Sequence, residues 1–132
     1  MSSALLIVGS VLIFLAAAFH VYVFFLESVT WLSPKTWKTF GLPSQEHAEI
    51  IRPMAFNQGF YNLFLALGIG VGLALLGINR TIAFTLMLFS SCSMVGAGAV
   101  LFFSVKTSRR AALIQAGPPL LGVVFVLLGL AF

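Results

Sequence analysis

The side chains best suited to chemistry in this sequence are polar groups embedded in long apolar runs. They are His20, Glu27, Asn57, Gln58, Tyr61, Asn62 and Gln115. Burying such groups in hydrocarbon costs free energy unless they find partners, and ionisable residues inside membrane helices usually mark functional sites. Imidazole titrates near neutral pH, so His20 could exchange a proton with Glu27 through water. The amides and the phenol could hold the polar head of a ligand.

The spacing of these residues predicts shared helix faces at a similar depth. One face of the first apolar run would carry His20, Phe24, Glu27 and Trp31. Glu27 lies near the end of that run, and His20 lies about 10 Å deeper. The band from Asn57 to Asn62 begins near the same end of the second run, and Gln115 lies about one turn inside the fourth. Three helices are therefore predicted to line one pocket that opens to the cytoplasm.

The elements that must position these groups are four apolar runs. They cover Ala4–Leu26, Pro53–Asn79, Thr81–Val105 and Ala111–Phe132, and each has 22 or more residues. A helix of that length crosses a bilayer core of about 30 Å. The chain is also 61% hydrophobic and only 8% charged, which excludes an ordinary soluble domain. We predict an all-α fold, a transmembrane antiparallel four-helix bundle forming one domain over residues 1–132. Its spans are expected at about 4–26, 53–76, 81–105 and 111–131.

The loops between the apolar runs contain residues that predict short helices and turns. In the first, Ser33 followed by Pro34 predicts a short helix that Gly41 would close. This helix is expected to lie in the membrane interface, with Trp31 and Trp37 at headgroup depth. A second short turn is expected at 45–51, after which Pro53 starts or kinks the second span. Short turns at 77–80 and 106–110 predict antiparallel neighbours.

Small residues within the runs predict close helix packing. Gly68 and Gly72 form a GxxxG pair in the second run. We expect this pair to pack inside the bundle rather than to form a dimer contact, because so small a bundle must use its glycines on itself.

Lysines and arginines are distributed unevenly over the connections, which predicts topology. The first connection holds Lys35, Lys38 and Arg52, the third holds Lys106, Arg109 and Arg110, and the second holds Arg80 alone. Because such cations are retained in the cytoplasm, the first and third connections should be cytoplasmic and both termini outside. The cations form no basic stripe, so nucleic acid is not an expected partner; anionic lipid headgroups are. We interpret the first run as a membrane helix that stays in the protein rather than as a cleaved signal peptide, because no lysine or arginine precedes it.

Several kinds of site are not predicted. His20, Glu27, His47 and Glu49 offer nitrogen and carboxylate ligands, but no HxxH or ExxH spacing exists to form a metal site. A haem site is not predicted either, because His20 is the only histidine in a membrane span and a second axial histidine is missing. No aspartate occurs and no serine stands in a GxSxG turn, so no catalytic residues are proposed and a non-enzymatic role is favoured. The residues do not specify a cofactor.

The same polar residues carry a family resemblance. The pattern runs His20-x3-Phe24-x2-Glu27-x3-Trp31, Phe40-Gly41, Asn57-Gln58-Gly59-x-Tyr61-Asn62 and Gln115-x-Gly117-Pro118. It resembles a family of small bacterial four-helix membrane proteins known only as the domain of unknown function numbered thirteen hundred and four. The resemblance implies a bacterial inner-membrane protein of four helices, with these polar positions as its signature, and it implies no activity.

Three functions and one purely structural interpretation remain open. The first is a binding protein whose polar pocket takes a small amphipathic molecule, a lipid head or a quinone-like ring. The second is an accessory subunit of a larger membrane complex. The third is a proton-coupled carrier of small solutes, which four helices could form only as a homo-oligomer. Alternatively, the polar groups bond only to one another and fix the register of the helices.

Overall fold

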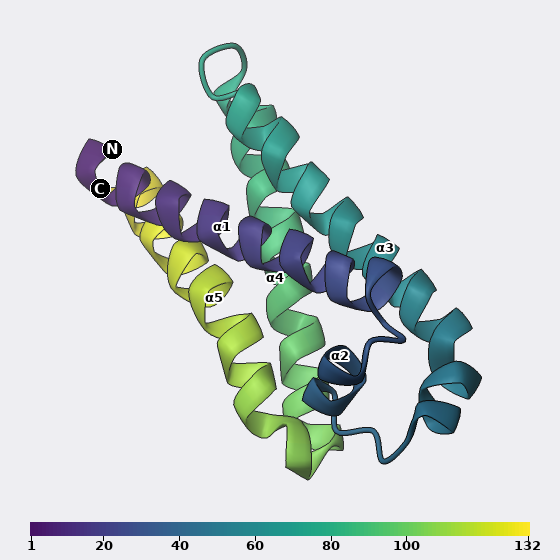
Figure 1. Cartoon of the computed structure of the whole chain (residues 1–132). Coiled ribbons are helices and arrows are strands. Elements are labelled where there is room, and N and C mark those ends of the chain that lie inside the picture. Colours follow the sequence, from purple (N-terminus) through teal and green to yellow (C-terminus); the bar gives the residue numbers. More distant parts are fainter. The chain divides into compact units, whose positions relative to one another are not determined.

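The structure is a computed structural model that describes all of residues 1–132, and every regular element in it is helical. The elements, shown in Figure 1, are α1 (Ser3–Phe24) with a π-helical turn (Phe25–Val29), α2 (Pro34–Thr39), α3 (Gln45–Ala74), α4 (Arg80–Ser104), a 3₁₀ turn (Lys106–Ser108) and α5 (Arg109–Ala131). Three helical stretches are long and apolar enough to cross a membrane, namely Ser3–Val29, Arg80–Ser104 and Lys106–Ala131. The predicted all-α fold is confirmed, and the three stretches are consistent with the predicted membrane protein.

Helix α3 departs from the prediction at its start. The separate turn expected at 45–51 is wrong, because one helix of 30 residues runs from Gln45 to Ala74 with Pro53 inside it. Proline cannot donate to the carbonyl four residues earlier, but the rest of the ladder carries the helix through. The first half of α3 holds charged and amide side chains, and α3 is not among the three apolar stretches. The four-span arrangement therefore stays a prediction.

The chain divides into two compact units. We call Met1–Phe19 with Leu65–Phe132 the bundle unit, and His20–Phe64 the connecting unit. In the bundle unit the two chain ends lie side by side, because the Ser2 amide donates to the Gly129 carbonyl at 2.9 Å (Figure 1). Large apolar side chains fill this unit, and those that are fully enclosed are Ile13, Ile69, Met87, Met94 and Val126.

Glycines allow helices of the bundle unit to approach closely. A β-carbon placed on Gly9 of α1 would lie 2.8 Å from the Val126 nitrogen and 3.0 Å from the Gly122 oxygen of α5. On α3, a β-carbon at Gly72 would lie 2.8 Å from the Ala83 oxygen of α4, and one at Gly68 would meet the Ser90 hydroxyl. The expected packing of the Gly68 and Gly72 pair inside the bundle is confirmed.

The short helix predicted in the first connection is also present as α2. Ser33 precedes it in an extended conformation and Pro34 is its first residue, as the sequence indicates. The Ser33 side chain makes no capping hydrogen bond; its carbonyl accepts from the Thr36 amide at 2.9 Å instead. Gly41 closes the segment with φ +77°, a conformation that suits glycine.

A substitution at Gly9 tests the contact between α1 and α5. Gly9→Ala forces its new methyl group against backbone atoms that cannot rotate away, so it should lower the unfolding free energy by about 1–3 kcal/mol. Gly117→Ala in α5 is the matched control, because a β-carbon there meets no atom within 4 Å. Thermal unfolding in detergent checks both variants. Equal melting temperatures for the two would contradict the close approach.

Candidate functional site

Two of the predicted site residues are joined by a hydrogen bond within the connecting unit. Glu27 lies in the π-helical turn that ends α1, and Asn62 lies in the middle of α3. The Asn62 Nδ2 donates to Glu27 Oε2 at 2.8 Å. Asn62 is only 6% exposed, and Glu27 is half-buried. The convergence of the first two polar stretches is therefore confirmed for this pair.

Gly59 makes the approach of these two segments possible. A β-carbon at Gly59 would collide with the Ser28 hydroxyl and lie 3.2 Å from Glu27 Cβ. Because Gly59 has no side chain, the Ser28 hydroxyl fits beside it and donates a hydrogen bond to the Phe56 carbonyl at 2.8 Å. Gly59 and Asn62 are three residues apart, so they lie on the same side of α3. One face of α3 thus holds the end of α1 by two side-chain hydrogen bonds.

The turn that carries Glu27 is wider than an α-helical turn. The Thr30 amide donates to the Phe25 carbonyl, five residues back, at 2.9 Å. Such single π turns within α-helices are rare and are frequent at functional sites. No single residue type marks a π turn, which is why the sequence did not predict it.

Aromatic rings cover the apolar side of the same junction. The Phe24 ring of α1 packs edge-on against Phe60 of α3, with centroids 5.2 Å apart. Phe56 and Phe64 flank Phe60 one turn away on each side, at 5.0 and 6.2 Å. Edge-to-face pairs stabilise by about 0.5–1.5 kcal/mol beyond their burial. These rings add an apolar contact between the end of α1 and α3.

Both tryptophans hold the connecting segment to α3. The Trp31 Nε1 donates to the Ala48 carbonyl at 2.9 Å, and the Trp37 Nε1 donates to Gln45 Oε1 at 2.8 Å. Both indoles are buried, so their hydrogen-bond partners come from the protein rather than from lipid headgroups. Their depth in a bilayer, and the interfacial position of α2, stay predictions.

The other predicted residues of the connecting unit lie on α1 and α3. His20, on α1, is 1% exposed. Trp31 lies in the turn after Val29 and not on the helix, so the predicted helix face does not extend to it. On α3 three side chains point outward, and Tyr61 is 59% exposed. They are Asn57, Gln58 and Tyr61.

Gln115 belongs to the bundle unit. It is half-buried on the inner face of α5, between the buried Ala112 and Pro119. Its participation in the site therefore stays a prediction. Sequence reasoning passed over Ser28 and the packing role of Gly59, although Gly59 stands at the centre of the Asn-Gln-Gly-x-Tyr-Asn block.

Together, three apolar stretches of spanning length and the hydrogen bond from Asn62 of α3 to Glu27 of the first stretch are consistent with a helical membrane protein that has an intramolecular polar junction. Residues 14–127 match the family model described as "Protein of unknown function (DUF1304)". The chain belongs to this family, as the sequence pattern predicted. No curated protein and no solved structure matches it.

A double-mutant cycle measures the junction. Glu27→Ala and Asn62→Ala should show a coupling free energy of about 0.6–1.7 kcal/mol, the range for hydrogen bonds between membrane helices. The control pair, Glu27→Ala with Gln58→Ala, should be additive within about 0.5 kcal/mol, because no bond joins these residues. Unfolding in mixed micelles by sodium dodecyl sulfate provides the free energies. Additive effects for Glu27 and Asn62 would contradict the bond.

Proposed function

We propose that the protein spans the bacterial inner membrane four times and binds the polar head of a small amphipathic molecule at the Glu27–Asn62 junction. One observation carries the proposal. Glu27 lies half-buried on a membrane-spanning stretch, bonds to the neutral amide of Asn62, and forms no ion pair with lysine or arginine. An acid placed in such a segment at a cost in free energy is a functional candidate by default.

The groups around the junction suit a polar head. A carboxyl group offers about four acceptor positions, of which Asn62 occupies one, so ammonium or hydroxyl donors are suitable partners. Gln58 lies one turn before Asn62 on the same side of α3, and its exposed amide can both donate and accept. The rings of Phe24 and Phe60 offer an apolar surface beside it. A lipid head or a quinone-like ring fits this combination.

One further predicted residue of the connecting unit belongs to the proposed pocket, in which His20 would set the charge near Glu27. In hydrocarbon, the open amides of Asn57 and Gln58 would cost free energy unless a ligand, water or protein satisfies them.

That same cost favours a second candidate function, an accessory subunit of a larger membrane complex. Asn57, Gln58 and Tyr61 are exposed, and Phe56 and Phe64 beside them are 50% and 59% exposed. A helix of a partner protein that covers this side of α3 would satisfy the amides and bury the rings.

Ligand binding is tested with two probes, lysophosphatidylethanolamine and a short-chain quinone, by native mass spectrometry. We expect at least one probe to bind, and Glu27→Gln or Gln58→Leu to weaken it about tenfold, since each removes one polar contact. Glu46→Leu, an exposed acid at the start of α3, is the control and should bind as the wild type does. If neither probe binds the wild type, or if neither variant weakens binding, the ligand proposal fails. A larger complex that co-purifies without ligand supports the second candidate.

The four-span topology is supported by the chain ends. Ser2 and Gly129 are hydrogen-bonded, and an even number of crossings would bring both chain ends to one side of the membrane. We therefore propose α3 as a fourth crossing beside the three apolar stretches; its second half packs on α4 through Gly68 and Gly72.

Reporter fusions test the orientation in cells. Alkaline phosphatase fused after Phe132 should be active, because the positive-inside rule places the termini outside. The same enzyme fused after Thr107, between Lys106 and Arg109, should be inactive. The opposite pattern would show the inverted orientation.

A further inference from the structure

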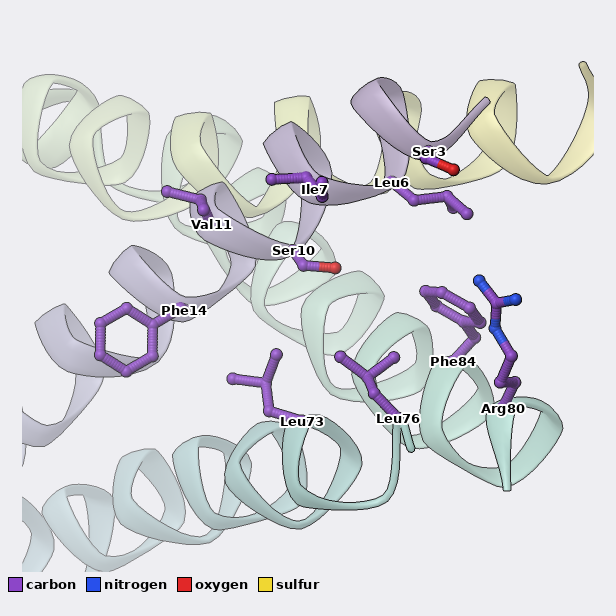
Figure 2. Close-up of a pocket in the computed structure, with 10 residues that line it drawn as sticks. All are labelled: Ser3, Leu6, Ile7, Ser10, Val11, Phe14, Leu73, Leu76, Arg80 and Phe84. Atoms are coloured by element: carbon purple, nitrogen blue, oxygen red, sulfur yellow. The ribbon is translucent and has the colours of Figure 1, made fainter. Parts of the chain in front are cut away.

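A separate cleft opens in the bundle unit, and none of the seven predicted site residues lines it. It lies between the first half of α1, the end of α3 and the start of α4, and its volume is about 580 Å³ (Figure 2). Ligand sites commonly measure about 300–1,000 Å³. Along α1 its wall runs from Ser3 to Phe14, which corresponds to about 16 Å of helix. This length matches the depth of one leaflet, about 15 Å of the 30 Å hydrocarbon core.

Apart from the Ser10 hydroxyl, the lining is hydrocarbon except near one end. Its apolar side chains include Leu6 and Val11 of α1, Leu73 of α3 and Leu76 of the turn that follows α3. Figure 2 shows the Arg80 guanidinium at the end of the cleft where α1 begins, beside the Phe84 ring. The cleft is therefore amphipathic, with an apolar channel and a cation at its mouth.

The bundle unit holds no acidic side chain that could pair with Arg80. The three acids of the chain are Glu27, Glu46 and Glu49, and all of them belong to the connecting unit. Arg80 is also the first residue of α4, where the helix dipole disfavours a cation. Stabilisation of α4 therefore does not explain this arginine, whereas a bound anion would.

We infer that this cleft binds an anionic phospholipid of the surrounding bilayer. One acyl chain lies in the channel along α1, and the phosphate accepts hydrogen bonds from the Arg80 guanidinium. Arginine suits this role because its planar donors match a phosphate in pairs. The Ser3 hydroxyl lines the same end of the cleft and can donate to the head. The site shares no residue with the Glu27–Asn62 junction, so it does not depend on the function proposed there.

The test compares phosphatidylglycerol with phosphatidylcholine on the detergent-solubilised full chain by native mass spectrometry. We expect phosphatidylglycerol to bind about tenfold more tightly, and Arg80→Gln to remove this preference without lowering the melting temperature, since Arg80 is exposed. Arg110→Gln is the matched control, an exposed cation outside the cleft that should keep the preference. Equal binding of the two lipids by the wild type, or an Arg80→Gln variant that still prefers phosphatidylglycerol, would overturn the inference.

A second variant tests the channel itself. Figure 2 shows the Ser10 hydroxyl directed into the cleft between Leu73 and Leu76, so Ser10→Phe should fill it and weaken both lipids. Ser10→Ala should bind both as the wild type does. Competition by inorganic phosphate alone at millimolar concentration would show a site for the head without the chain, and would overturn the assignment of the channel to an acyl chain.

Discussion

A carboxyl group on a helix of otherwise apolar residues must find a hydrogen-bond partner, and the surroundings of Glu27 follow from that need. Asn62 donates to it at 2.8 Å, which requires the end of α1 to lie directly on α3. Gly59 provides the space, and Ser28 adds a second bond to the α3 backbone. Trp31 then fixes the chain that leaves α1 by donating to the Ala48 carbonyl. The connecting unit is therefore organised by polar groups that satisfy one another.

The bundle unit is held together differently. Its helices meet at glycines, such as Gly9 against Gly122, and its enclosed side chains are almost all hydrocarbon. In a bilayer, lipid tails are as apolar as leucine, so close van der Waals packing rather than the hydrophobic effect must hold such helices together. Small residues give that packing because they bring two backbones within contact distance. One chain thus uses polar bonds in one unit and close packing in the other.

The sequence predicted the features that follow from periodicity and from local turn chemistry. The start of α2 at Ser33 and Pro34 and the inward position of Gly72 both depend on residues near in sequence. The start of α3 was missed because Pro53 resembles a first helical residue, although proline is also tolerated within a helix when neighbouring bonds persist.

Features that depend on distant residues were less predictable. Four amide or phenol groups on α3 were candidates for a hydrogen bond to Glu27, and the structure shows that Asn62 makes it. Which of the four side chains faces Glu27 depends on how α3 is rotated about its axis relative to the π turn. A cleft is harder still to predict, since it arises where side chains fail to fill space, and no residue pattern records that. The single cation at the α3–α4 turn was interpreted as a topology signal, which gave no indication of the apolar channel beside it.

The family match covers the whole polar junction but only part of the cleft. The match covers residues 14–127, so it includes Glu27, Gly59 and Asn62, whose contacts give a physical reason for two parts of the shared pattern. The α1 wall of the cleft is formed mainly by residues before that range, from Ser3 to Val11. The family match therefore covers the junction completely and the cleft in part, through Phe14, Leu73, Leu76, Arg80 and Phe84. If the junction holds a ligand, relatives with the same pattern are expected to hold a similar one. A lipid in the cleft would depend both on the residues at the start of α1, which precede the matched range, and on Arg80, which lies inside it.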